Sequence, residues 1–209
     1  MPLRYRTIMA FTIDETFLPA ILTAPPMTDE QFADFCTAHP DLFFEMTAAG
    51  EIIVMPPTFS LTSIRNRDIT SQLDRWASQD RRGLVGESSG GFVLPSGARR
   101  SPGASWISKD AIRQLNQESF RGYWHLCPAF VIELRSHSDR LPVLRAKMEE
   151  YIVNGARLGW LIDADARTVE VYRPDCKPES LVGVDSVAGE GPVEGFVLDL
   201  RTVWDPLAA

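Results

Sequence analysis

Apolar residues recur along this chain with two periods, which predict strands that alternate with amphipathic helices. Short apolar runs, several of them strictly alternating, predict strands at 43–46, 51–55, 84–87, 91–94, 100–107, 130–135, 158–162, 168–172 and 196–200. Apolar rows at a spacing of three or four residues predict a short helix between Thr28 and Pro40 and longer helices at 62–80, 109–117 and 139–154. Strands and helices that follow one another through short connections favour an α/β fold, with a mixed central sheet flanked by helices.

One of these strands carries charged residues inside an apolar run. Residues 130–135 read FVIELR, so strand alternation places Glu133 and Arg135 on one face together with Val131. A carboxylate in so apolar a strand is costly to bury unless it is paired or binds a metal. Glu133 and Arg135 are therefore the first candidates for a functional site.

The following helix carries a lysine at the edge of its apolar stripe. Ser138 or Asp139 can cap this helix, and Pro142 suits its first turn. At about 100° per residue, Lys147 falls on the row of Val143 and Tyr151, within the edge of the apolar stripe. If the helix packs on the sheet, the ammonium is drawn toward Glu133. A snorkelling lysine in a structural ion pair and a lysine in a functional site are both open interpretations of this pattern.

Composition and charge limit the class of protein. The chain has 209 residues, 44% hydrophobic and 23% charged, which is typical of a soluble globular protein with one substantial domain. We expect an N-terminal arm at 1–26, which can hold one strand and lie along a partner subunit in a homodimer, and one domain at 27–209. The net charge of −7 disfavours a broad nucleic-acid-coating surface but permits a local basic cleft.

The cysteines and the N-terminus indicate the compartment. Cys36, Cys127 and Cys176 are scattered and odd in number, so they suggest neither a disulfide framework nor a zinc site. The first residues lack the apolar core of a signal peptide, and no run approaches the length of a membrane span. A cytoplasmic protein is expected.

Seven stretches, taken in order, resemble a known family. They are MTDEQFADFC (27–36), GEIIVMPPT (50–58), RN (65–66), SSGGFVLPSGARRSPGASWIS (88–108), CPAFVIELRSHSD (127–139), KMEEYIVNGARLGWLID (147–163) and VEVYRP (169–174). Together they resemble the Uma2-like proteins (DUF820) of the PD-(D/E)XK nuclease superfamily. The resemblance implies a restriction-endonuclease-like fold, a nucleic-acid partner and phosphodiester hydrolysis with Mg²⁺ or Mn²⁺ held by two carboxylates on adjacent strands.

The resemblance also implies roles for particular residues. Glu133 matches the second metal-binding carboxylate, Arg135 stands where the superfamily has its signature lysine, and Lys147 matches a lysine that has migrated to the helix. The first carboxylate is absent, because Gly103 stands where the family pattern Ser-Pro-Asp-Ala-Ser has aspartate. Leu61 stands where related sequences have glutamate. The resemblance therefore predicts a nuclease fold with weak or absent nuclease activity.

Three other residues are weaker candidates. Glu45 and Glu87 could supply a replacement carboxylate, although both are expected to be surface or hairpin residues. His137 replaces a proline common in its turn, where it could act as an acid or base with a pKa near ~6.5, or be a plain turn residue.

The sequence leaves three functions open. The chain could be a nuclease, either active or inactivated, or a binding protein that keeps the fold without chemistry. It could also use the fold for another reaction, with Glu133, Arg135, His137 and Lys147 as the reacting groups. Fold alone cannot separate these functions. A metal beside Glu133 would favour the first, and an apolar pocket there would favour the third.

Overall fold

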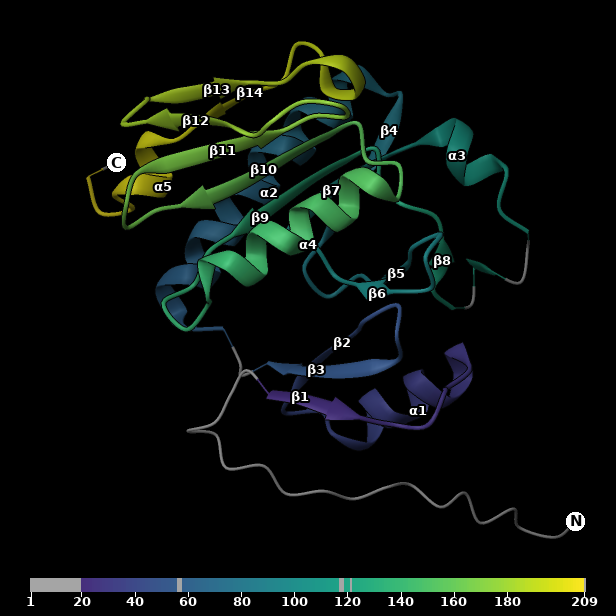
Figure 1. Ribbon diagram of the computed structural model, residues 1–209. Helices are drawn as coiled ribbons and strands as arrows, with labels where there is room; N and C mark the ends of the chain where they lie inside the picture. Colours follow the sequence, from purple (N-terminus) through teal and green to yellow (C-terminus); the bar gives the residue numbers. More distant parts are fainter. Residues whose placement is uncertain (1–19, 56–57, 117–118, 121, 209) are drawn as a thin grey trace, which may run out of the picture.

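The chain folds into a layered α/β structure, as the apolar periods predict (Figure 1). The computed structural model describes residues 20–55, 58–116, 119–120 and 122–208. The predicted arm up to residue 19 and the predicted helix end at Gln117 lie outside the described residues.

A six-stranded mixed sheet, called the central sheet below, forms the middle layer. Its order is β12-β11-β10-β9-β7-β4, in which β9 and β10 are parallel and the other neighbouring pairs are antiparallel. The strands are β4 (Gly83–Glu87), β7 (Ala104–Ser108), β9 (Phe130–Leu134), β10 (Leu158–Asp163), β11 (Thr168–Tyr172) and β12 (Glu179–Val182). The strand that carries Glu133, β9, is thus an interior strand of this sheet.

A second six-stranded sheet, called the side sheet, has the order β1-β3-β2-β6-β5-β8. The strands are β1 (Ala20–Thr23), β2 (Phe43–Met46), β3 (Glu51–Met55), β5 (Phe92–Val93), β6 (Arg99–Arg100) and β8 (Trp124–His125). Strand β1, from the end of the predicted arm, pairs with β3. In Figure 1, β1, β2 and β3 lie below the central sheet together with the helix α1.

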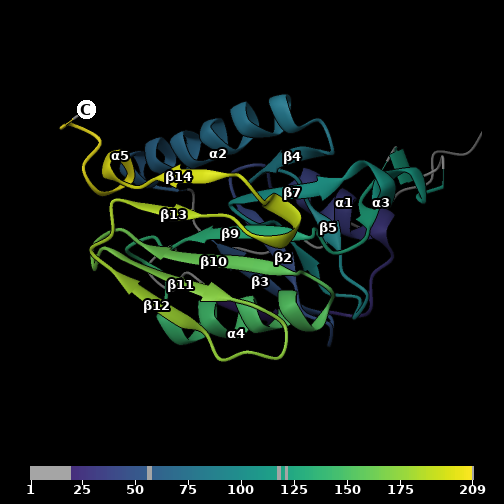
Figure 2. The same cartoon turned by 90° about the horizontal axis from the view of Figure 1, so that it is seen from above.

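Helices cover both faces of the central sheet. The helices are α1 (Asp29–Ala38), α2 (Ser60–Asp80), α3 (Lys109–Arg113), α4 (Leu141–Val153) and α5 (Arg201–Trp204), with a 3₁₀ turn at Gly191–Val193. Figure 2 shows α2 and α4 on opposite faces of the sheet. Within the described ranges, no helix combines the length and the apolar character needed to span a bilayer.

The alternation of β9 builds two separate apolar cores. Phe130 and Ile132 pack in one buried cluster with Leu73 of α2, whereas Val131 packs in another with Met148 of α4. All five side chains are at most 1% exposed. Full burial of such a side chain contributes about 1.5–3 kcal/mol, so the strand parity read from the sequence is fixed by packing on both faces.

The strand predicted at 100–107 is in fact two strands in different sheets. Strand β6 ends at Arg100 and pairs in the side sheet, and β7 begins at Ala104 and pairs in the central sheet. The chain crosses between the sheets through Pro102 and Gly103. Proline has no N–H for a strand ladder, so the break falls where a continuous strand would lose a hydrogen bond.

Two predicted helix boundaries differ in their capping residues. Gly83 is the glycine that the sequence predicts to end the helix at 62–80, but α2 ends through Arg81, whose φ of 62° is left-handed, and Gly83 is the first residue of β4. Helix α4 begins after Arg140. Asp139 instead accepts a hydrogen bond from the Ser136 N–H at 2.8 Å, which closes the turn before the helix.

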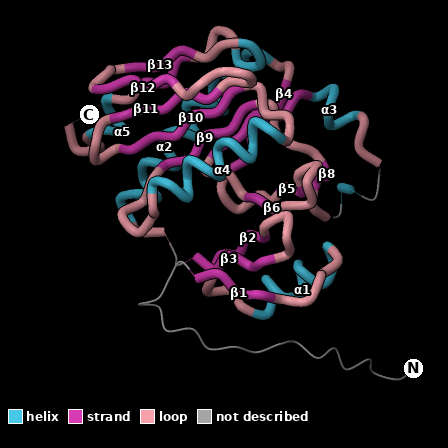
Figure 3. Tube along the Cα trace, in the orientation of Figure 1, coloured by secondary structure: helices cyan, strands magenta, loops and turns pink. Residues whose placement is uncertain are grey.

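Several short elements carried no usable sequence signal. The helix predicted at 109–117 ends at Arg113, and β8 and β12 are missing from the prediction, together with β13 (Ser186–Ala188) and α5. The strand predicted at 196–200 is confirmed as β14 (Val197–Asp199). These short segments lie mostly in the C-terminal part of the chain (Figure 3), where too few residues repeat to establish a period.

Candidate functional site

Glu133 lies in the interior of the central sheet, on β9 between β7 and β10. Its main chain pairs with Leu161 of β10, and only 7% of the residue is exposed. The Lys147 Nζ on α4 lies 2.7 Å from Glu133 Oε1. The predicted contact between the strand carboxylate and the helix lysine is therefore confirmed.

A second carboxylate reaches the same ammonium from the side sheet. Glu45 of β2 is 2% exposed, and its Oε1 lies 2.8 Å from Lys147 Nζ. The expected surface position of Glu45 is wrong, although the residue does lie in a hairpin, which β2 forms with β3. Strand β2 lies between β3 and β6, and the three residues Phe44, Glu45 and Met46 are all buried.

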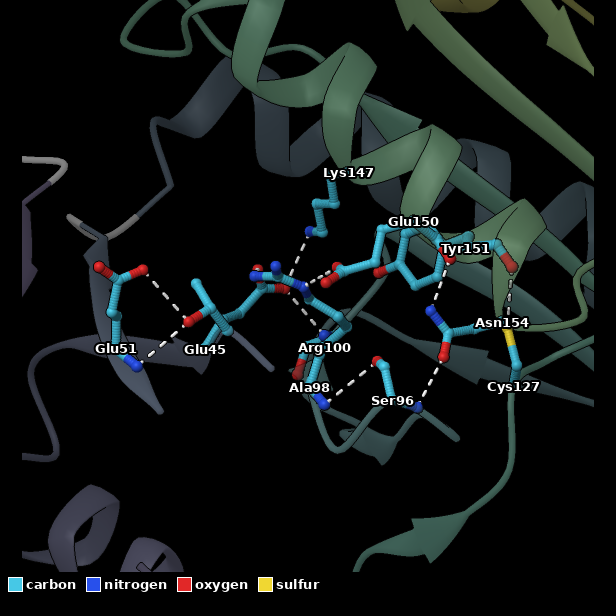
Figure 4. Close-up of polar contacts among 12 residues, drawn as sticks. Glu45, Glu51, Ser96, Ala98, Arg100, Cys127, Lys147, Glu150, Tyr151 and Asn154 are labelled. Carbon is cyan, nitrogen blue, oxygen red and sulfur yellow. Dashed lines mark hydrogen bonds and ion pairs between the residues drawn. The ribbon is translucent and has the colours of Figure 1, made fainter. Parts of the chain in front are cut away.

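Arg100 completes the charged cluster from β6. Its Nη1 lies 3.1 Å from Glu45 Oε2, and its Nε lies 2.5 Å from Glu150 Oε2 on α4. The Ser101 N–H donates to Glu45 Oε1 at 2.9 Å. Figure 4 shows Glu45 and Arg100 below the part of α4 that carries Lys147 and Glu150. The cluster therefore joins the side sheet to the helix that covers the central sheet.

The two buried carboxylates differ in proton affinity, although both contact Lys147. Burial raises the pKa of Glu45, but Lys147 and Arg100 outweigh burial and lower it below its usual value. Burial also raises the pKa of Glu133, and Lys147 compensates only in part because the charge of Glu45 raises it further. Glu45 is thus the firmly ionised member of the pair, and Glu133 is the member that more readily holds a proton.

Lys147 and Tyr151 respond to the same carboxylates. Burial lowers the pKa of Lys147, but Glu133 and Glu45 outweigh burial and raise it above its usual value. The Tyr151 hydroxyl donates to Glu133 Oε1 at 3.1 Å, and burial together with the two carboxylates raises the pKa of Tyr151 well above its usual value. At neutral pH the site contains a charged ammonium and a neutral phenol.

A cavity of about 290 Å³ opens beside this cluster, and Glu133, Lys147 and Gly103 line it. Gly103 directly precedes β7, whose first residue pairs opposite Ile132, so its backbone lies next to β9 as predicted. A Cβ placed on Gly103 would lie 3.1 Å from Asn66 Oδ1 and 3.1 Å from the Ile132 carbonyl oxygen. The Asn66 side chain therefore lies close to the space that a larger residue at 103 would enter.

Arg135 does not join the cluster, contrary to the prediction. Its Nη1 lies 2.5 Å from Asp163 Oδ2 at the end of β10, and its Nε donates to the Asp139 carbonyl oxygen at 3.4 Å. Arg135 has the parity of Glu133, but Asp163 on the neighbouring parallel strand is the nearer partner. The parallel register pairs Glu133 with Leu161 and Leu134 with Ile162, so Asp163 lies beside Arg135 on the same face of the sheet, a neighbour that the pattern of β9 alone does not reveal.

His137 and Leu61 also lie apart from the cavity lining. His137 is exposed in the turn, whereas its neighbours Ser136 and Ser138 line the cavity. Leu61 is 47% exposed, and it is Thr62 that lines the cavity from the first turn of α2. A one-residue shift on a helix turns the side chain by about 100°, so the residue matched to the family glutamate lies on a different side.

Glu87 remains at the surface, as expected. It is the last residue of β4, it is exposed, and it accepts a hydrogen bond from the Ser89 hydroxyl. Of the two alternative carboxylates considered from the sequence, only Glu45 contributes to the cluster.

Comparison with known proteins agrees with this architecture. A crystal structure described as "a putative nuclease belonging to DUF820 from Anabaena variabilis ATCC 29413" aligns with a TM-score of 0.71 and 20% sequence identity, covering 86% of this chain and 98% of that chain. At that identity the likeness shows the shared restriction-endonuclease-like fold. No protein with a curated description matches the chain. The model of the Uma2 family, described as "Putative restriction endonuclease", matches residues 29–201, and the chain therefore belongs to the Uma2 family.

Proposed function

We propose that this protein is a nuclease-fold protein in which Mg²⁺- or Mn²⁺-dependent hydrolysis of nucleic-acid phosphodiesters is weak or absent. The observation that carries the proposal is the position of Lys147 Nζ, 2.8 Å from a Glu45 oxygen and 2.7 Å from a Glu133 oxygen. The ammonium is thus ion-paired with both buried carboxylates, and Gly103 has no side-chain oxygen that could bind a metal ion. A nuclease of this superfamily needs acidic oxygens free for its metal.

The donor set supports this proposal, because three of the four carboxylate oxygens of Glu45 and Glu133 contact other groups of the protein. Glu45 Oε1 accepts from Lys147 and Ser101, and Glu45 Oε2 contacts Arg100. Glu133 Oε1 contacts Lys147 and accepts from Tyr151. Mg²⁺ requires near-octahedral oxygen ligands, so the side chains as arranged do not fit it. Across the described residues, no group of three or more histidine, cysteine, aspartate or glutamate side chains is placed to hold a metal ion.

A non-hydrolytic binding protein is the second candidate function. Each charged side chain of the cluster has an oppositely charged partner within 3.1 Å. The cavity beside them is lined by hydroxyl groups and by aromatic rings, among them Thr62, Ser101, Phe44 and Tyr123. Such a lining can bind a ligand without chemistry. A different reaction that uses Arg135 and His137 loses support, because Arg135 pairs with Asp163 and His137 is exposed in the turn, so neither joins the cluster. The homodimer and the cytoplasmic location stay predictions.

A plasmid-nicking assay with Mg²⁺ and with Mn²⁺ tests the proposal. The unchanged protein should nick weakly or not at all. Gly103→Asp adds the missing carboxylate. Asn66→Ser removes the side-chain contact at 3.1 Å from the new Cβ, and the Ile132 carbonyl oxygen, also at 3.1 Å, must shift by a few tenths of an ångström. The double variant should gain metal-dependent nicking, and Glu133→Gln added to it should abolish that gain.

The matched control adds the same acid away from the cavity. Gly122 is exposed, and a Cβ there meets no atom within 4 Å, so Gly122→Asp should fold and should gain no nicking. Strong metal-dependent nicking by the unchanged protein, lost in Glu133→Ala, would show that another group has replaced the missing ligand and that the proposal is wrong.

A further inference from the structure

The buried charges around Lys147 are arranged about one cationic centre. Both carboxylate oxygens that contact Nζ come from separate sheets, Glu45 from the side sheet and Glu133 from the central sheet. The side chains of Lys147, Glu45 and Glu133 are 11%, 3% and 9% exposed. Two buried carboxylates that face one another repel unless a cation lies between them. Here that cation is the ammonium group of the protein's own Lys147 side chain.

We propose that the Lys147 ammonium is the resident cation of a two-carboxylate site formed by Glu45 and Glu133, and that removing this ammonium converts the site into one for a divalent cation. The inference deepens the proposed function, on which it rests for the choice of site. It differs from restoring a ligand at Gly103, because both carboxylates it requires are already present.

The anchoring of Lys147 explains why a free cation does not displace it. Its neighbours on α4, Met148 and Tyr151, are 0% exposed, so the helix is held firmly over the two carboxylates. A tethered group acts at a high effective concentration, against which a dissolved ion must compete. The ammonium also remains charged at neutral pH, because Glu133 and Glu45 stabilise it.

Charge and space both favour a divalent ion once the ammonium is gone. The cluster holds three carboxylates, Glu45, Glu133 and Glu150, and two cations, Lys147 and Arg100. Its formal charge is therefore −1, and loss of the ammonium makes it −2, which a divalent cation neutralises. Hard cations take carboxylate oxygens at about 2.0–2.6 Å, so a small inward shift from the present N–O spacing suffices. The adjoining cavity can hold the water ligands that such ions retain.

The test measures Mn²⁺ binding by calorimetry and by the loss of the free-Mn²⁺ paramagnetic resonance signal. Lys147→Ala should bind one Mn²⁺ per chain, and millimolar Mn²⁺ should raise its Tm. Adding Glu45→Gln or Glu133→Gln should each weaken that binding by roughly tenfold or more. The matched control is Lys177→Ala, which removes an exposed lysine and should bind no more Mn²⁺ than the unchanged protein.

Two results would overturn the inference. One is a Lys147→Ala protein that binds Mn²⁺ no better than the unchanged protein. The other is an unchanged protein that already binds one Mn²⁺ and loses it in Glu133→Gln. The site would then bind a divalent cation with the Lys147 ammonium still present. If Lys147→Ala folds only when refolded with Mn²⁺, the inference is supported. If it stays unfolded with Mn²⁺ while Lys147→Ala/Glu133→Gln folds without metal, the inference is wrong.

Nicking separates this inference from the proposed function. Mn²⁺ binding by the unchanged protein without nicking would refute the inference and leave the proposed function standing. Strong Mg²⁺-dependent nicking by the unchanged protein that persists in Glu133→Gln would refute the proposed function and leave the inference standing.

Discussion

Replacing Lys147 by methionine should destabilise the protein strongly at neutral pH. Methionine keeps a long flexible side chain of similar volume under α4, so the change removes the charge with little loss of packing. Among the residues that the structure describes, Glu45 keeps Arg100 and the Ser101 N–H, whereas Glu133 keeps the Tyr151 hydroxyl alone. Most of the cost therefore falls on Glu133.

The magnitude follows from the burial of the three side chains. Removing one partner of a buried ion pair costs about 3–5 kcal/mol, because the other charge is left without compensation. For a chain of this size each kcal/mol corresponds to roughly 2–4 °C, so the Tm should fall by roughly 6–20 °C. Adding Glu133→Gln to Lys147→Met should recover much of this loss, because the uncompensated charge is then absent.

The loss should depend on pH in a defined direction. Without the ammonium, burial and the charge of Glu45 hold the folded-state pKa of Glu133 above the unfolded value of about 4.3. The resulting penalty is present at high pH and is lost as the pH falls and the folded protein takes up protons. The difference between the unchanged protein and Lys147→Met should therefore be smaller at pH 5 than at pH 7.

Urea unfolding followed by tryptophan fluorescence, at both pH values, measures this difference. A loss of under about 1 kcal/mol at pH 7 would place Lys147 among ordinary surface ion pairs and would refute the reasoning. An equal loss at the two pH values would show that packing, and not charge, is what Lys147 contributes.

Three further predictions concern other parts of the chain. Burial raises the pKa of Asp163, but its arginine partner and two main-chain N–H groups outweigh burial and lower that pKa. The ionised Asp163 therefore stabilises the fold above its unfolded pKa of about 3.9, and this stabilisation is lost as the pH falls through the lower pKa of the folded state. Asp163→Asn should therefore lose about 1–3 kcal/mol in urea unfolding at pH 7 and much less in strong acid, and an equal loss in both would contradict the assignment. Leu73→Ala in the fully buried core should cost about 2–5 kcal/mol by the same method, whereas Leu61→Ala, at a half-exposed position, should cost little; similar losses for the two would argue against this packing. Burial raises the pKa of Cys127 to about 12, so a thiol reagent at pH 8 should label the exposed Cys176 first and Cys127 only on unfolding, and rapid labelling of Cys127 in the folded protein would be inconsistent with its burial.

Much of the central sheet follows from local sequence. The alternation in β9 and the apolar row in α4 are properties of single segments, and each fixes which side chains face the neighbouring layer. That is why the contact between Glu133 and Lys147 could be predicted, although the residues belong to different elements. The packing of Val131 against Met148 confirms the same geometry.

The local pattern gives a wrong prediction where the chain passes from one sheet to the other. The apolar and polar residues from 100 to 107 read as one strand, yet Arg100 pairs in the side sheet and Ala104 pairs in the central sheet. The basic pair Arg99-Arg100 follows a turn and stands among apolar residues. This pattern was the feature of the sequence that could have predicted buried charged side chains in this segment.

The sequence by itself determined the α/β layers, the interior position of Glu133 and the direction of Lys147, because these depend on periods of two and 3.6 residues within one segment. Only the tertiary structure decided that Glu45 lies under the same helix and that Arg135 pairs with Asp163. Such partners depend on the path of the chain between segments. A buried charge is stabilised by whichever opposite charge that path brings within about 4 Å, and the spacing of residues in the sequence carries no measure of that distance.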